Sequence, residues 1–258
     1  MSEYYKTNRG SDWNYGGGNW KLSRSKIDLF LECPRCFYLD NKLGVKRVPG
    51  FPFSINSAVD HLLKQEFDIH RAKNEQHPFQ KEYGIDAKPA QHAEIDEWRR
   101  NFGGVKYLHK PTGMLVTGAI DDLWINSKGE YIVVDYKSTA KEQPVRELDK
   151  EWQDGYKRQM EVYQWLLRHN DLKVSDTGYF VYCTGKMDKE AFDKKVEFDV
   201  VLIPYEGSDK WVEPTLVDIK KCLDSDKIPA PNKNCDHCAY WYSRKAFEKD
   251  ERKTPSLF

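Results

Sequence analysis

The chain has 258 residues, of which 39% are hydrophobic and 14% aromatic, enough to bury a sizeable core. Lys plus Arg equals Asp plus Glu at 41 each, so the net charge gives no general attraction for a polyanion. No apolar run reaches the length of a transmembrane helix and the first residues lack the apolar core of a signal peptide, so we expect an intracellular protein without membrane association.

The N-terminal part is predicted to be helical after a polar arm. Residues 1–21 are polar and show no periodicity, which predicts a flexible arm. Capping residues in Leu22-Ser23-Arg24-Ser25 predict the start of a helix that Pro34 interrupts. Apolar residues at helical spacing predict two further helices, over 57–69 and 90–101.

Strand patterns follow in the second half. Two strands over 115–126 and 131–137 flank a short polar turn containing Gly129, so we expect a hairpin. The remaining predicted elements are a helix over 152–168, strands over 178–183 and 196–203, and a helix over 211–223. Helices on both sides of a strand cluster predict an α/β fold with helices packed on a central sheet. We expect one domain over 22–245, followed by a tail over 246–258.

The predicted hairpin carries the residues with the clearest chemistry. Asp135 and Lys137 are two apart on a strand and therefore project from one face. A three-residue turn over 127–129, ending in a left-handed glycine, would place Asp121 opposite Asp135. A two-residue turn would place Asp122 there instead, and both registers remain open at this stage.

Two aspartates and a lysine on one strand face favour metal-assisted chemistry. Carboxylates bind hard divalent cations such as Mg²⁺ or Mn²⁺, which position a phosphate and activate water, while a lysine can orient that water. The alternative is a salt bridge between Asp135 and Lys137 at a strand end.

The cysteines indicate a second metal site. Cys33 and Cys36 form one Cys-x-x-Cys pair, and Cys235 and Cys238 form another. Cysteines of an intracellular chain are usually reduced, so a four-thiolate site joining the two ends of the domain is a better explanation than disulfides. The alternative is that one pair consists of free buried thiols. Thiolates alone suit an iron-sulfur cluster or Zn²⁺.

The sequence resembles the RecB-like branch of the PD-(D/E)xK nuclease superfamily. Gly118-Ala119-Ile120-Asp121, followed by Val133-Val134-Asp135-Tyr136-Lys137, carries the resemblance. It implies a restriction-endonuclease-like core, in which a central mixed β-sheet is flanked by helices. It also implies metal-dependent phosphodiester hydrolysis, with Asp121 and Asp135 as metal ligands and Lys137 as a catalytic residue. The Gly-x-Ile before Asp121 favours it over Asp122.

The same resemblance assigns residues on two helices. His61 occupies a place similar to an upstream histidine that binds the metal in this branch, although the usual glycine before it is absent. An imidazole beside two carboxylates favours Mn²⁺ somewhat over Mg²⁺. Gln159 and Tyr163 match a Gln-x-x-x-Tyr motif on the helix after the Asp-x-Lys strand, which implies that they orient the lysine or contact the DNA backbone.

The segment from Leu22-Ser23-Arg24-Ser25 through Cys33-Pro34-Arg35-Cys36-Phe37-Tyr38 resembles iron-sulfur exonucleases of the RecB-like and CRISPR-adaptation kinds. Those proteins use one N-terminal cysteine and three C-terminal ones, whereas this chain has two and two. The resemblance favours a four-iron, four-sulfur cluster at the four cysteines, with Zn²⁺ as the alternative.

These observations predict a metal-dependent DNA exonuclease acting on DNA ends or single strands. Recombination, repair, replication and CRISPR adaptation are all compatible, and the balanced charge favours a helicase, recombination or integrase partner that supplies DNA affinity. Two alternatives remain. One is a non-catalytic nucleic-acid-binding or assembly protein with a structural four-cysteine site, and the other is a structure-specific or RNA-cleaving endonuclease on the same core.

Overall fold

The computed structural model describes residues 10–50 and 54–250, which form two compact units. Unit 1 combines residues from both ends of the chain, up to 50 and from 214, and unit 2 contains the residues between them. Residues 1–9 of the predicted arm and 251–258 of the predicted tail lie outside the described residues. No helix in the described ranges has an apolar stretch long enough to cross a membrane.

Unit 2 holds the sheet that the strand patterns predict. Its elements in chain order are α3 (Ser54–Lys73), α4 (Pro78–Glu82), β2 (Lys88–Pro89), α5 (Ile95–Trp98), β3 (Val105–His109), β4 (Met114–Gly118), β5 (Asp122–Ile125), β6 (Tyr131–Ala140), the 3-10 turn η2 (Glu151–Gln153), α6 (Asp154–Arg168), β7 (Thr177–Gly185) and β8 (Phe198–Glu206). The five-stranded sheet has the order β2-β5-β6-β7-β8. Only β6 and β7 run parallel, so the sheet is mixed as predicted.

The predicted strand over 115–126 is two strands. β4 ends at Gly118 and pairs with β3, whereas β5 begins at Asp122 and pairs with β6. A Cβ atom on Gly118 would lie 2.7 Å from the ring of Tyr163, so glycine allows the chain to pass closely under α6 at this point. The break leaves Asp121 directly before β5.

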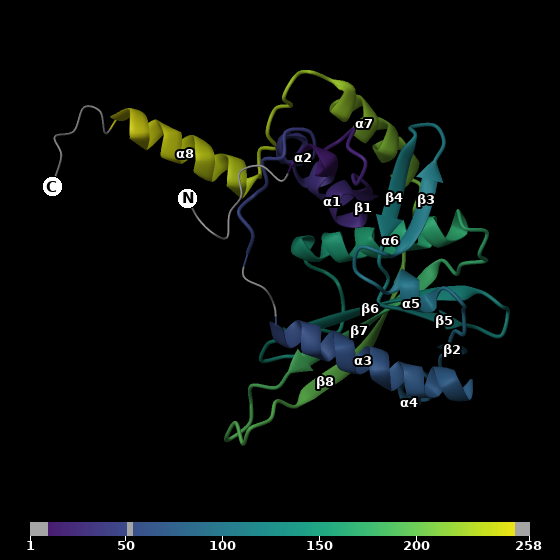
Figure 1. Cartoon of the computed structure of the whole chain (residues 1–258). Coiled ribbons are helices and arrows are strands. Elements are labelled where there is room, and N and C mark those ends of the chain that lie inside the picture. The colour runs from purple at the N-terminus through teal and green to yellow at the C-terminus, as the bar shows by residue number, and fades with distance from the viewer. Residues whose placement is uncertain (1–9, 51–53, 251–258) are drawn as a thin grey trace. The chain divides into compact units, whose positions relative to one another are not determined.

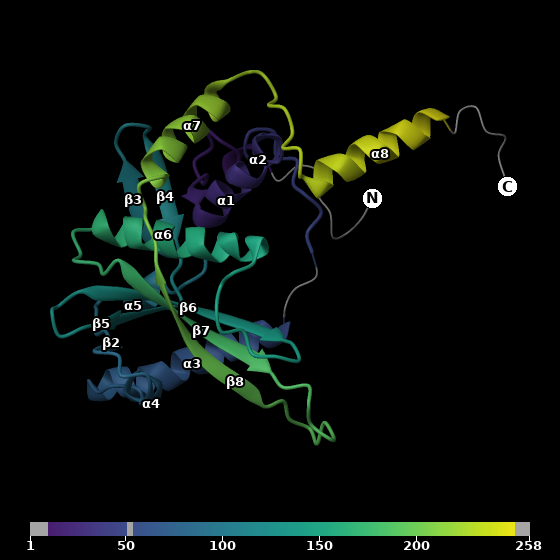
Figure 2. The ribbon, with the colours of Figure 1, turned by 180° about the vertical axis from the view of Figure 1, so that it is seen from behind.

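Two helices cover the sheet, one on each face (Figure 1). On one face, Phe67 of α3 stacks on Trp124 and Tyr136, with ring centroids 5.5 and 5.8 Å apart. On the other face lies α6, whose Met160 would clash with a Cβ atom at Gly178 of β7. Figure 2 shows the same layers from behind. Alternate residues of β6 therefore face different helices.

Unit 1 is built from short helices. Its elements are η1 (Ser11–Trp13), β1 (Leu22–Ser23), α1 (Arg24–Glu32), α2 (Pro34–Asn41), most of α7 (Val212–Asp224) and α8 (Asp236–Asp250). Ser23 caps α1 through its side chain, and the helical region is interrupted at Pro34 as predicted, because α1 ends at Glu32, α2 begins at Pro34 and Cys33 lies between the two helices. The last helix covers residues that were predicted as part of the tail.

Candidate active site

The β5–β6 hairpin sets the positions of two aspartates. Its turn closes with a backbone hydrogen bond of 3.1 Å between Asn126 and Glu130, and Gly129 has a φ of 71°. In the resulting register Asp122 pairs with Val134, so Asp121, which directly precedes β5, continues this register to the position across from Asp135. This is the register predicted for the three-residue glycine turn, and the alternative with Asp122 across from Asp135 does not form.

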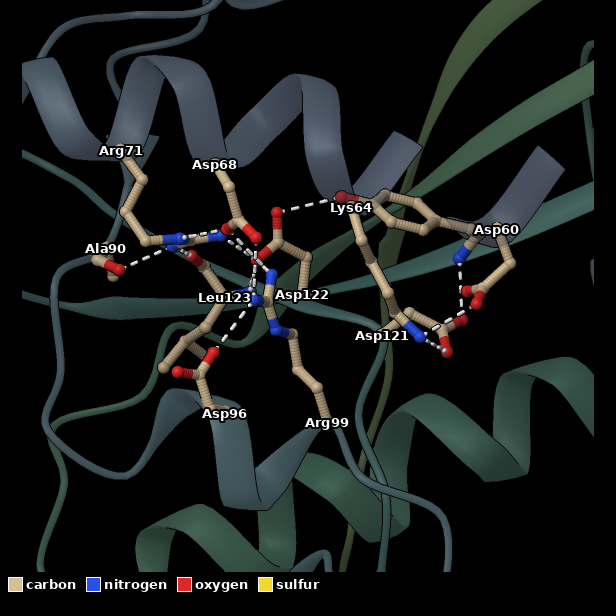
Figure 3. A network of polar contacts seen from close by, with 11 residues as sticks. Asp60, Lys64, Asp68, Arg71, Ala90, Asp96, Arg99, Asp121, Asp122 and Leu123 are labelled. Carbon is tan, nitrogen blue, oxygen red and sulfur yellow. Dashed lines mark hydrogen bonds and ion pairs between the residues drawn. The ribbon is translucent and has the colours of Figure 1, made fainter. Parts of the chain in front are cut away.

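Asp122 projects to the face that α3 covers. Its carboxylate is fully buried, accepts a hydrogen bond of 2.8 Å from the Tyr136 hydroxyl, and pairs with Arg71 and Arg99 (Figure 3). Asp68 links the two guanidinium groups at 2.9 and 2.8 Å. Burial raises the pKa of the Asp122 carboxyl, and the positive charge of Arg71 opposes that effect. These partners satisfy Asp122 within the core, which suits a structural role.

Asp135, Lys137, Gln159 and Tyr163 form one connected group. Asp135 is fully buried and pairs with the Lys137 ammonium group. Gln159 Nε2 donates to Asp135 Oδ1 at 2.7 Å and to the Tyr163 hydroxyl at 3.0 Å, while Lys137 Nζ donates to Gln159 Oε1 at 3.4 Å. Gln159 and Tyr163 lie one turn apart on α6 and so hold Asp135 from the side of the helix.

Lys64 of α3 contacts Asp121. The Tyr136 N–H donates to Asp121 Oδ2 at 2.9 Å. Lys64 Nζ lies 3.7 Å from Asp121 Oδ1 and 2.9 Å from Asp60 Oδ2, so it bridges the two carboxylates (Figure 3). Burial and the nearby charge of Asp121 raise the pKa of the Asp60 carboxyl. Asp60 therefore belongs to the same electrostatic cluster as Asp121.

His61 directly follows Asp60 on α3, and its side chain is exposed. Among the described residues, neither His61 nor Asp60 brings a ligand atom within 4.8 Å of both Asp121 and Asp135, so this distance does not separate the two candidates. Adjacent residues of a helix point about 100° apart, so the turn that directs Asp60 toward Asp121 directs His61 away. The resemblance assigned His61, which stays a prediction, and Asp60 is a second candidate ligand on the same helix that the sequence analysis did not name.

The acidic cluster has the composition of a site for a hard cation. Asp60 and Asp121 share Lys64, and Asp135 lies further along the hairpin register. All three aspartates offer carboxylate oxygens, the ligands that Mg²⁺ and Mn²⁺ prefer, but the three do not lie within 4.8 Å of one another among the described residues. Lys64 and Lys137 neutralise two of these three charges, which leaves one negative charge in a partly buried place. A divalent cation fits this donor set better than a softer metal.

The four predicted thiolates are gathered in unit 1. Cys33, Cys36, Cys235 and Cys238 are all buried, and their sulfur atoms lie within 4.8 Å of one another. Arg47 reaches Cys235 Sγ at 3.6 Å and Glu32 at 2.7 Å. The two pairs, about 200 residues apart in the sequence, therefore form one site that could hold a metal ion.

Backbone amides already favour ionisation of one thiol. Burial raises the pKa of Cys33, but the N–H groups of Asn232 and Cys36 outweigh it and lower this pKa to about 7. The Asn232 N–H lies 3.5 Å from Cys33 Sγ. Such amide–sulfur contacts stabilise thiolate ligands, so the loop before α8 supports the site as well as supplying Cys235, while Cys238 lies in the first turn of α8.

Comparison with known proteins identifies the fold family. Residues 21–242 match the family model described as "PD-(D/E)XK nuclease superfamily". The chain belongs to the PD-(D/E)XK nuclease superfamily. No curated protein matches this chain. A solved structure described as "Crystal structure of SSO0001" is 15% identical, with a TM-score of 0.42, and the match covers 86% of this chain and 84% of that one.

Membership in the PD-(D/E)XK superfamily agrees with the geometry of the hairpin. The superfamily is named for an acidic residue and an Asp/Glu-x-Lys strand, and the residues predicted for these positions, Asp121 and Asp135-Tyr136-Lys137, lie within the matched range. The match also spans both cysteine pairs. A nuclease fold with a four-cysteine cluster from its N- and C-terminal regions, as expected from the sequence, is therefore present.

Proposed function

We propose that this chain is a metal-dependent deoxyribonuclease that hydrolyses phosphodiester bonds at Asp121, Asp135 and Lys137. The observation that carries the proposal is the register that sets Asp121 across from Asp135, with Lys137 on the same face of β6. A purely structural ion pair between Asp135 and Lys137 would not need a second carboxylate opposite it, nor a third at Asp60.

The residues of the cluster have distinct roles in this proposal. A divalent cation held by Asp121 and Asp135 would polarise the phosphodiester and lower the pKa of an attacking water. Lys137 then orients that water or stabilises the charge that develops on the phosphate. Gln159, anchored by Tyr163, keeps Asp135 and Lys137 in place before the substrate arrives.

The substrate proposed is a DNA end or a single strand, which rests on the resemblance of the Asp121 and Asp135 motifs to RecB-like exonucleases. The balanced charge of the chain supports a partner, such as a helicase, a recombination protein or an integrase, that delivers the DNA.

Digestion of labelled single strands tests the activity directly. Linear and closed-circular single-stranded DNA, and linear RNA of the same sequence, are incubated with the protein and Mn²⁺, Mg²⁺ or EDTA. We expect metal-dependent loss of the linear DNA and survival of the circle. Cutting of the circle would show an endonuclease, and equal loss of the RNA would remove the specificity for DNA.

Asp60 and His61 are neighbours on α3, and substitution of each tests which of them helps to bind the cation. We expect Asp60→Asn to weaken Mn²⁺ binding by about tenfold or more, because it removes a carboxylate beside Asp121. His61→Ala is the matched control, because it alters the next residue on the same helix and its ring is exposed. Calorimetric titration of each variant with Mn²⁺ measures the effect. If His61→Ala weakened binding more than Asp60→Asn, the ligand assignment from the sequence would stand instead.

The spacing of the sulfur atoms supports zinc at the four cysteines over the cluster favoured by the resemblance. Three of the sulfur–sulfur distances are 3.6, 3.6 and 3.8 Å. Four thiolates about 2.3 Å from a tetrahedral zinc ion lie about 3.8 Å apart. In a four-iron, four-sulfur cluster each thiolate binds a different iron, which holds the sulfurs further apart than the 4.8 Å that contains all four here.

Elemental analysis decides between the two metals. Protein purified without oxygen should contain one zinc ion per chain and little iron, and should lack the broad visible absorption of an iron-sulfur cluster. About four iron atoms per chain, with that absorption, would show that the cysteines move apart to hold a cluster.

A further inference from the structure

An aromatic and cationic ladder leads from the candidate active site to solvent. Lys137 Nζ lies 4.5 Å from the ring centroid of Tyr156, on the first turns of α6. The Tyr156 ring meets Trp152 edge to face, with centroids 5.7 Å apart. Lys141, just after β6, places its ammonium group 5.1 Å from the Trp152 ring. The two neighbouring rings therefore lie between two cations.

Exposure increases along this ladder. Asp135 is fully buried, Lys137 and Tyr156 are half-buried, and Trp152 is 54% exposed. More than half of the Trp152 side chain is thus open to solvent, and only the Tyr156 ring links it to Lys137, the lysine of the proposed reaction. Because 54% of Trp152 is exposed, its burial contributes less to the fold than that of a core tryptophan, and its ring meets Tyr156 and Lys141.

We propose that Trp152 and Tyr156 form a stacking platform for an unpaired base next to the scissile phosphate. This inference rests on the proposed nuclease function and names its substrate class as single-stranded nucleic acid. Each base of a single strand has a free π-face that can stack on an aromatic ring, whereas a base inside a duplex must first be unstacked. Lys137 and Lys141 flank the rings and can contact the adjacent phosphates.

Charge alone does not explain how the surface around Trp152 and Tyr156 would bind single-stranded nucleic acid. Residues 141–158 include five basic and five acidic side chains, so their net charge is close to zero. Stacking on Trp152 and Tyr156 must then supply much of the affinity, and it does so without reading the base sequence. The same rings would place the strand so that a phosphate lies at Lys137.

The test compares three variants in an Asp135→Asn background, which prevents cutting during the measurement. Trp152→Ala removes the exposed ring and Trp152→Phe keeps a smaller one. Trp13→Ala is the control, because Trp13 is 52% exposed and lies in unit 1. Binding of a fluorescein-labelled oligothymidylate and of a closed hairpin duplex is followed by fluorescence anisotropy.

We expect Trp152→Ala to weaken single-strand binding by about tenfold or more relative to the parent protein, which carries Asp135→Asn alone. Trp152→Phe should bind the single strand with an affinity close to that of the parent, and Trp13→Ala should bind it with the same affinity. Duplex binding should change much less. In the active protein, Trp152→Ala should raise KM by more than it lowers kcat, because the ring binds the flanking nucleotide and not the reacting atoms.

Two results would overturn the platform. Unchanged single-strand binding by Trp152→Ala would remove Trp152 from the substrate site, and an equal loss on the duplex would remove the preference for unpaired bases. Both leave the proposed nuclease function intact, because cutting by the wild type and its loss in Asp135→Asn are scored separately. If the wild type cut no nucleic acid and the parent bound none, the proposed function would fail together with the platform.

Discussion

Asp135→Asn is expected to reduce metal-dependent cleavage by about 10³-fold or more, while the protein remains folded. Asparagine keeps the shape of the side chain and can still accept the hydrogen bond from Gln159. It loses the negative charge that binds the cation and pairs with Lys137. A catalytic cation contributes several kcal/mol to transition-state stabilisation, and each 1.36 kcal/mol corresponds to a tenfold change in rate. Initial rates on labelled single-stranded DNA with Mn²⁺ measure the loss.

Asp122→Asn is the matched control for this result. It removes a buried carboxylate close to the site, but on the face that α3 covers, where Arg71 and Arg99 surround it. We expect a lower melting temperature, because two guanidinium groups lose their buried partner. Cleavage by the folded fraction should persist. If Asp122→Asn abolished cleavage and Asp135→Asn did not, the proposed division of roles between the two faces would be wrong.

The hairpin was predictable from the sequence because local chemistry determines it. Gly129 can adopt the positive φ that a three-residue turn requires, and this turn fixes which residues of β5 and β6 lie opposite each other. Asp121 and Asp135 follow from that register. The four-cysteine site was also predictable from the sequence, because two cysteines at Cys-x-x-Cys spacing can bind the same metal ion.

Other features depend on contacts that the local sequence does not reveal. The break between β4 and β5 comes directly after Gly118, which lies against Tyr163 of α6, a residue distant in the sequence. The helical phase of α3 decides that Asp60, and not His61, faces Asp121, and this phase is set by packing of Phe67 on the sheet. The role proposed for Trp152 depends on its packing against Tyr156, whose ring lies next to Lys137, and the local sequence does not reveal these contacts.

The four-cysteine site leads to the second large effect, on stability. Cys235→Ser should remove the bound metal and unfold much of unit 1, since zinc binding contributes about 10–16 kcal/mol in small zinc-dependent peptides. That is comparable to the whole stability of a domain, about 5–15 kcal/mol. Unit 1 has a small apolar core, so a metal link between α2 and the start of α8 is a large share of its cohesion.

Hydrogen exchange followed by mass spectrometry resolves where that loss occurs. Protection should fall in α1, α2 and α8, and it should persist in β6 and β7, which have their own core around Val134 and Val181. Cys222→Ser is the control, because Cys222 lies in the same unit but outside the cluster. Equal protection of the amides of α1, α2 and α8 in Cys235→Ser and wild type would mean that the thiolates do not hold the N- and C-terminal parts of unit 1 together. Loss of protection throughout the sheet would instead mean that the sheet of unit 2 cannot stay folded without the metal site.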